Sequence, residues 1–312
     1  MAELINEFSW SKSRDETFRK CPRLYYYQYY GSWGGWNADC DDRTRELYVL
    51  KQLTSRAMWA GQKVHVCIER ALENIRRRID PMSEADAIAT TLAVMRKDYA
   101  NSRRGDYWRN PKTCGFFEHE YGLDLPDTAW KETADHVVGC LQTFYRSEVY
   151  KEICGIPPER WLDVEDFSSF QMDAEGIPGG VKVHVVLDFS YRADGGGIVI
   201  YDWKTGRSDS ERNELQLACY TFYATEKWRV TPEEVTTKEF NLASGRLAPY
   251  NLRGVGLEAI LQYMRGSIRD MRVQLDDADR NRASEERFAF AANESTCRYC
   301  NFRKVCARWE KK

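Results

Sequence analysis

The chain has 312 residues, 43% of them hydrophobic, which is enough to bury a substantial core in one elaborated domain. Its 46 basic and 48 acidic residues leave a formal net charge of −2, which excludes a global attraction to nucleic acid but allows local charged patches. The chain starts without a signal sequence and has no stretch of about 18 apolar residues, so we expect a soluble, cytoplasmic protein with no membrane partner.

Helical patterns dominate the first half of the chain. Ser13 and Glu16 have the spacing of a capping box, which predicts a helix starting near Ser13 with Cys21 in its third turn or just beyond. Pro22 then begins a second helix that ends at Gly31. Residues 43 to 79 read as one amphipathic helix, and residues 83 to 152 as mainly helical.

The pattern changes to strands at Trp161. From there to Lys204 the chain is rich in valine, isoleucine and aromatic residues, interrupted by two glycine-rich turns. Residues 211 to 228 return to helix, a strand pair follows around residues 235 to 252, and a long helix is expected from 255 to 290. This order predicts an α/β fold with a central sheet flanked by helices.

The strand IVIYDWK, residues 198 to 204, ends in charged side chains. Asp202 and Lys204 are two apart and therefore point to one side of the strand. A hairpin turn centred on Gly195 would place Asp188 opposite Asp202, and like charges at about 4.5 to 5.5 Å in cross-strand pairs are destabilising. A divalent cation between them, with Lys204 alongside, would remove the repulsion. The alternative is a solvated strand end with an ordinary salt bridge.

Further polar side chains are candidates for the same place. Gln216 and Tyr220 are four apart on the helix that follows, so they share a face and could hold a phosphate or a water. His65, among apolar positions of a helix, could reach the same metal, although such a histidine is also typical of a hydrogen-bonded core residue. Glu165, on the strand before the hairpin, is a weaker candidate.

These motifs occur in an order that resembles a known family. GQKVH, VVLDF, IYDWK and QLACY contain, in turn, His65, Asp188, Asp202 with Lys204, and Gln216 with Tyr220. The order resembles the RecB-type branch of the PD-(D/E)XK nucleases, which implies a restriction-endonuclease-like core with a mixed central sheet.

The resemblance also implies a role for each side chain. Asp188 and Asp202 would bind Mg²⁺ or Mn²⁺, helped by His65 and the backbone carbonyl of Trp203. Lys204 would orient the attacking water, while Gln216 and Tyr220 would position the DNA backbone.

Four of the ten cysteines have a notable arrangement. Cys21 stands alone near the start, and Cys297, Cys300 and Cys306 lie close together at the end. This arrangement resembles the iron–sulfur members of the branch, the AddB-type helicase-nuclease subunits and the exonucleases of CRISPR adaptation, and implies a [4Fe-4S] cluster that joins the chain ends. Spacing alone also allows zinc, although structural zinc sites usually have two short cysteine hooks and this chain has one.

The resemblance implies a metal-dependent DNA nuclease, an exonuclease or end-processing enzyme acting on single strands or ends. The sequence has no GxxxxGK[ST] loop, so a helicase motor would have to be a separate protein. The expected protein partner is such a helicase, an integrase or a defence complex. The alternative is a catalytically silent DNA-binding scaffold with a structural cluster. We expect one domain over residues 1–312: a cysteine segment (1–40), a helical region with His65 (41–155), the sheet core (156–250), and a terminal helix with the cysteine motif (251–312).

Aromatic residues near the start have two interpretations. The run YYYQYY, with Trp33 and Trp36, could stack unpaired bases, but such residues more often pack a helix against the core.

Overall fold

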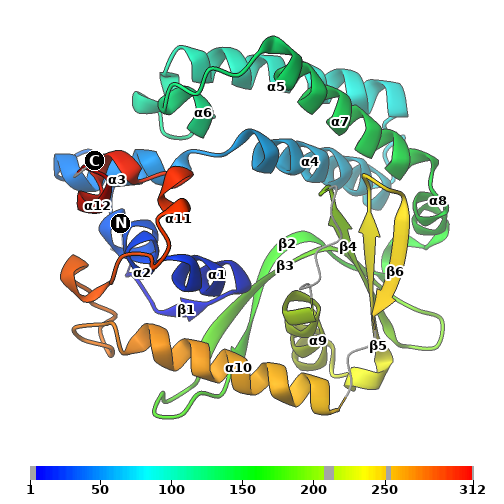
Figure 1. The fold of residues 1–312 in the computed structure, drawn as a ribbon. Helices are drawn as coiled ribbons and strands as arrows, with labels where there is room; N and C mark the ends of the chain where they lie inside the picture. The colour runs from blue at the N-terminus through cyan, green and yellow to red at the C-terminus, as the bar shows by residue number, and fades with distance from the viewer. Residues whose placement is uncertain (1–4, 207–213, 251–253, 311–312) are drawn as a thin grey trace.

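The protein is described by a computed structural model covering residues 5–206, 214–250 and 254–310. A mixed sheet lies at its centre with helices on both faces (Figure 1). The strand order is β1-β3-β4-β5-β6, with β2 paired to β3 off this path. The strands are β1 (Ser9–Trp10), β2 (Trp161–Met172), β3 (Val181–Arg192), β4 (Ile198–Lys204), β5 (Val235–Asn241) and β6 (Arg246–Tyr250). The predicted α/β class with a mixed central sheet is confirmed.

The hairpin of β3 and β4 has the predicted register. Its antiparallel pairs run from Arg192 with Ile198 to Phe189 with Tyr201, which is the register of a turn centred on Gly195. On its other edge β4 pairs in parallel with β5. β4 is therefore a central strand with both faces covered, which explains why its first four residues are all apolar and buried.

Two helical layers cover the sheet. On one face α4 (Arg56–Arg76), α5 (Glu84–Arg103) and α7 (Asp127–Arg146) pack together, and α4 also contacts β2. On the other face lie α9 (Glu214–Trp228) and α10 (Val255–Arg272). In the part of the chain that the structure describes, no helix has both the length and the apolar character needed to cross a membrane.

The first and last segments pack together at one end of the molecule (Figure 1). Asn301 donates to the carbonyl of Leu53 at 2.7 Å, and Tyr27 donates to Glu285 at 2.6 Å. These contacts join helices from both ends of the chain. The helices at this end of the molecule are α1 (Lys12–Lys20), α2 (Pro22–Tyr26) with a π-helical turn (Tyr27–Gly31), α3 (Asp42–Gln52), α11 (Ser295–Arg298) and α12 (Ala307–Glu310). Two further α-helices, α6 (Phe117–Glu120) and α8 (Glu148–Gly155), come from the middle of the chain.

Several predicted helix boundaries were wrong. The helix expected over 43 to 79 is two helices, because Ser55 caps a new one by accepting from the amide of Met58 at 3.3 Å. The helix expected over 255 to 290 ends at Arg272. α1 is capped by Ser11 instead of Ser13. Strand β1 was not predicted, and residues 211 to 213 of the expected helix lie outside the described residues.

The tyrosine run is mainly a packing element. Tyr25 and Tyr27 are fully buried, and Tyr25 packs against Phe288 near the other end of the chain. Trp33 and Trp36 are 38% exposed and meet edge to face. The core interpretation therefore describes the buried tyrosines better than base stacking.

Candidate metal-binding cleft

A histidine and two carboxylates converge beside the point where β3 and β4 separate. His65 comes from the middle of α4, Glu165 from β2 and Asp188 from β3. His65 Nδ1 lies 2.9 Å from Glu165 Oε1 and 3.3 Å from Asp188 Oδ1. One ligand atom from each of the three residues lies within 4.8 Å of the others, close enough for all three to contact one ion. We call these residues the metal trio.

Glu165 joins the trio through an unusual backbone conformation. Its φ is +50°, in the left-handed region that side chains other than glycine rarely adopt. The ladder pairs Val164 with Phe189 and Asp166 with Leu187, and it passes over Glu165 between them. A left-handed residue of this kind costs about 1 kcal/mol or more. In exchange, the carboxyl group of Glu165 reaches His65.

A second group of side chains surrounds Asp202. Lys204 Nζ lies 2.6 Å from Asp202 Oδ2 and donates to Gln216 Oε1 at 3.0 Å. Asp202 Oδ1 accepts from Gln216 Nε2 at 2.9 Å and from the Tyr220 hydroxyl at 3.0 Å. These four residues form one closed network, which we call the lysine network. It holds the Lys204 ammonium group between a carboxylate and an amide oxygen.

The two groups meet through the backbone of β4. The β3–β4 ladder ends at Phe189 and Tyr201, and beyond it the amide of Trp203 donates to Asp188 Oδ2 instead of to a carbonyl of β3. The Trp203 ring is buried in the core, stacked on Tyr201 with centroids 5.3 Å apart. Asp188 therefore contacts His65 of the metal trio with one oxygen, and with the other it accepts from the amide that lies between Asp202 and Lys204 of the lysine network. Together, the trio and the network form what we call the cleft.

Burial controls the charge of the cleft. Burial raises the pKa of Glu165 to about 7, with a further contribution from Asp188 and opposition from His65. Burial raises the pKa of Asp202 to about 6 although Lys204 opposes it. Burial lowers the pKa of His65, but Asp188 and Glu165 outweigh it and raise that pKa well above its ordinary value. A cation bound beside these carboxyl groups would lower their pKa values again, because an opposite charge nearby favours the ionised form.

The donor set suits a hard divalent ion. Carboxylate oxygens are the ligands that Mg²⁺ and Mn²⁺ prefer, and an imidazole nitrogen is compatible with Mn²⁺. The residues present therefore fit the metal that the sequence analysis expected.

The structure brings the predicted site residues together, with one difference in grouping. His65 and Asp188 lie in the metal trio, while Asp202, Lys204, Gln216 and Tyr220 form the lysine network. Glu165, only a weaker candidate in the sequence, occupies the trio position that Asp202 was expected to share. Nothing in the sequence indicates the left-handed backbone of Glu165. Its position on the strand before the hairpin, next to the strand of Asp188, could be predicted. A contact of the Trp203 carbonyl with a metal stays a prediction.

Four cysteines gather where the chain ends meet. Cys21 lies between α1 and α2, where its sulfur accepts from the amide of Leu24 at 3.4 Å. It lines one cavity together with Cys297, Cys300 and Cys306. Burial raises the pKa of the Cys300 thiol to about 12, and the other three cysteines add to the rise. We call these four residues the cysteine group.

The spacing of the sulfur atoms bears on what the cysteine group could hold. Tetrahedral Zn²⁺ with Zn–S bonds of about 2.3 Å brings its sulfur ligands to within about 3.8 Å of one another. Within the described residues, the metal trio is the only group of three or more possible ligand atoms from His, Cys, Asp or Glu that all lie within 4.8 Å of one another. No three of these four sulfur atoms are therefore that close together.

Comparisons with known proteins give one family match. The sequence model of the PD-(D/E)XK nuclease superfamily matches residues 9–307. The comparison with curated proteins finds no match. Among solved structures, SSO0001 is similar at 16% identity and a TM-score of 0.32, over 62% of this chain and 79% of that one. A likeness this low carries no argument beyond the family match.

Proposed function

Because this chain belongs to the PD-(D/E)XK nuclease superfamily, we propose that it is a Mg²⁺- or Mn²⁺-dependent deoxyribonuclease of the RecB-type branch. Membership implies nuclease-type activity, and DNA hydrolysis from ends or on single strands is the specific form proposed here. One observation supports it above the others: Asp188 links a trio fit for a metal to a network that holds a lysine beside a carboxylate.

In this proposal His65, Glu165 and Asp188 hold the metal, and Asp202 adds a carboxylate from the next strand. The metal, when bound, polarises the scissile phosphate and lowers the pKa of a bound water. The chain's own contribution is to position the reacting groups. Hydrogen bonds hold Asp188 and Asp202 in place, and their burial excludes bulk water, which strengthens each electrostatic contact.

Lys204 is the proposed catalytic cation. Burial lowers its pKa, but Asp202 outweighs this effect and the pKa is raised, so the ammonium group stays charged at neutral pH. A fixed positive charge at this point orients the attacking water and offsets the charge that develops on the phosphate. Gln216 and Tyr220 position Lys204 and Asp202 through the hydrogen bonds of the network.

For the cysteine group we propose a [4Fe-4S] cluster with a structural role. Four thiols around one cavity support this choice, since Cys thiolates are the ligands of such clusters. The cluster would tie the segment at Cys21 to the segment at Cys297–Cys306. A separate helicase, integrase or defence protein is the proposed partner, since the sequence carries no nucleotide-binding loop of its own.

The test compares cleavage by Lys204→Ala with cleavage by the wild-type protein. End-labelled single and double strands are incubated with Mg²⁺ or Mn²⁺, and products are followed by gel. We expect the variant to lose about 10²- to 10³-fold in rate while it binds DNA as the wild type does. Lys238→Ala is the matched control. Lys238 is also half-buried, but it lies on β5 and pairs with Glu152 of α8, outside both the metal trio and the lysine network.

Equal cleavage by the wild type and Lys204→Ala would remove the catalytic assignment. DNA binding without cleavage in either metal would favour the scaffold function over the nuclease.

A further inference from the structure

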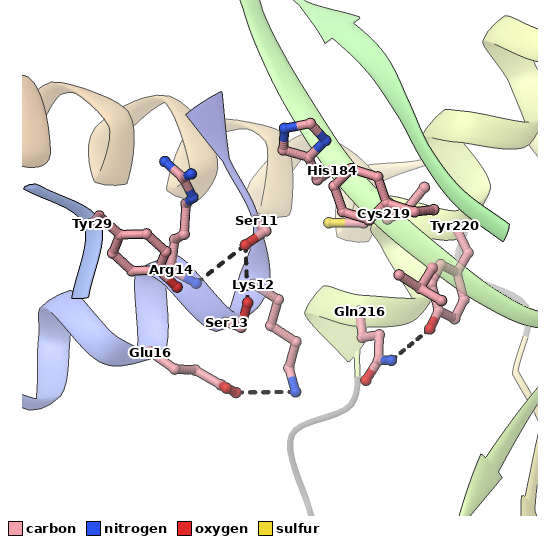
Figure 2. A pocket seen from close by; sticks show the side chains of 13 residues that line it. Ser11, Lys12, Ser13, Arg14, Glu16, Tyr29, His184, Gln216, Cys219 and Tyr220 are labelled. Atoms are coloured by element: carbon pink, nitrogen blue, oxygen red, sulfur yellow. Dashed lines mark hydrogen bonds and ion pairs between the residues drawn. The ribbon is translucent and has the colours of Figure 1, made fainter. Parts of the chain in front are cut away.

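A large groove opens next to the lysine network. It encloses about 470 Å³ and is lined by residues from α1, β2, β3 and α9. Figure 2 shows Ser11, Lys12 and Arg14 on one side, with His184, Gln216 and Tyr220 across from them. We call this space the edge groove. Gln216 and Tyr220 belong both to the groove and to the lysine network, so the groove continues directly from the cleft.

The groove runs along the edge of β3 opposite to β2, and in the described residues part of this edge pairs with no strand. On this edge β1 pairs with Lys182 and Val183, and β4 pairs only from Phe189 onward. The intervening segment, residues 184 to 188, leads from the groove to Asp188. At about 3.3 Å per residue, His184 and Asp188 are roughly 13 Å apart along the strand. That length corresponds to at most about four nucleotides at the roughly 3.4 Å rise of a stacked strand.

An aromatic pair lies at the far end of this segment. Phe167 on β2 stacks on His184 with ring centroids 4.7 Å apart and planes 25° apart. Phe167 is 72% exposed, and Val186 beside it is 38% exposed. Burial lowers the pKa of His184, and Arg14 and Lys182 lower it further, so the ring is neutral at neutral pH. A neutral, exposed aromatic stack has the properties of a platform for nucleic-acid bases.

The opposite wall of the groove is polar and contains two cations, Arg14 and Lys12, and one carboxylate, Glu16. Arg14 lies over the ring of Tyr29 at 4.4 Å and donates to the Ser9 carbonyl at 3.1 Å, which fixes its position. Lys12 pairs with Glu16 at 3.0 Å at the helix surface. The groove thus has an aromatic side for bases and a side with cations for phosphates.

We propose that the edge groove binds the unpaired DNA strand that continues from the scissile phosphate, with one base stacked on the Phe167–His184 pair. This inference rests on the proposed function, since it takes the cleft as the place where a phosphate is bound. A single strand fits better than a duplex because stacking on Phe167 needs the face of an unpaired base. The stacked base lies two to four nucleotides from the bond that is cut.

Phe167→Ala tests the platform by two measurements. The first is binding of a fluorescent single-stranded 20-mer, measured by anisotropy with EDTA so that no cleavage is needed. We expect about 10-fold weaker binding for Phe167→Ala and near wild-type binding for Phe167→Trp, which keeps a stacking surface. Ile79→Ala, which removes another exposed apolar side chain in the connection after α4, should bind as the wild type does.

The second measurement locates the base. In single-turnover cleavage, an abasic site is moved one position at a time away from the cut bond. The wild type should slow about 10-fold at one position two to four nucleotides away, and Phe167→Ala should show no such position. The melting temperature of Phe167→Ala should match the wild type because the side chain is exposed.

Unchanged strand binding by Phe167→Ala would overturn the proposal, and equal weakening for single strands and duplexes would overturn the assignment to an unpaired strand. If the wild type binds in a Phe167-dependent way but cuts nothing in either metal, the nuclease function fails and the groove assignment stands.

Discussion

The cleft and the cysteine group both gather side chains of types that can bind metals, but the chain builds them differently. The cleft draws on α4, three strands and α9, all from the middle of the chain, and its carboxylates are held by hydrogen bonds within the protein. The cysteine group brings Cys21 together with residues 297 to 306. The cleft is thus supported by the core, whereas the proposed cluster on the cysteine group would support the contact between the chain ends.

This difference separates activity from stability. A substitution in the cleft should change chemistry while the sheet beneath it stays folded. A substitution in the cysteine group should loosen the junction of the first and last segments. The experiments below would sharpen that division or break it.

The largest effect is expected for Asp188→Asn. Asp188 is the carboxylate that joins the trio to the backbone of β4, so the variant should lose Mn²⁺ binding and about 10³-fold in cleavage rate. Titration calorimetry and single-turnover cleavage measure the two effects. Asp194→Asn, in the exposed hairpin turn, is the control and should behave as the wild type does. Wild-type cleavage by Asp188→Asn would break the division at its centre.

The next effect concerns stability. Joining Cys21 to the cysteines near the other end closes a loop of well over 100 residues, which is worth about 5 to 6 kcal/mol in chain entropy. If Cys300→Ser loses the cluster, it should lower the free energy of unfolding by up to about that amount. Anaerobically purified wild type should be brown, with absorbance near roughly 400 nm from iron–thiolate bonds, and the variant should be paler. Cys154→Ser, at an exposed thiol, is the control. A colourless wild type with stoichiometric zinc would contradict the iron assignment.

The smallest effect is expected for Tyr220→Phe. The change removes the hydroxyl that donates to Asp202 at 3.0 Å and accepts from Gln216, which is worth about 1 kcal/mol and thus about a fivefold loss of cleavage rate. Tyr223→Phe is the matched control on the same helix, because its hydroxyl bonds to Asp163 outside the cleft. That control should affect the melting temperature more than the rate. The reverse pattern would show that stability and activity are not separable on α9.

The sequence predicted the parts of the cleft that depend on local geometry. The hairpin register followed from the glycine turn at residue 195, which brought Asp188 next to the charged end of β4. Gln216 and Tyr220 share a helix face because they are four residues apart, and the structure confirms their contact. Short-range spacing was sufficient for each of these predictions.

What the sequence could not show depends on long-range contacts. The short strand β1 forms only because β3 offers a free edge at Lys182 and Val183. The end of α10 at Arg272 has no glycine or proline to mark it, and tertiary packing decides it. The break after α3 did have a signal, since Ser55 is a suitable helix cap that a search for N-caps would find.

The left-handed backbone at Glu165 places two demands in opposition. Relaxing the chain there would favour a glycine or an asparagine, yet either residue would take a carboxylate away from His65. A search for stabilising substitutions in this protein would therefore select this position early. A glycine or an asparagine there would raise the free energy of unfolding but remove the proposed metal ligand.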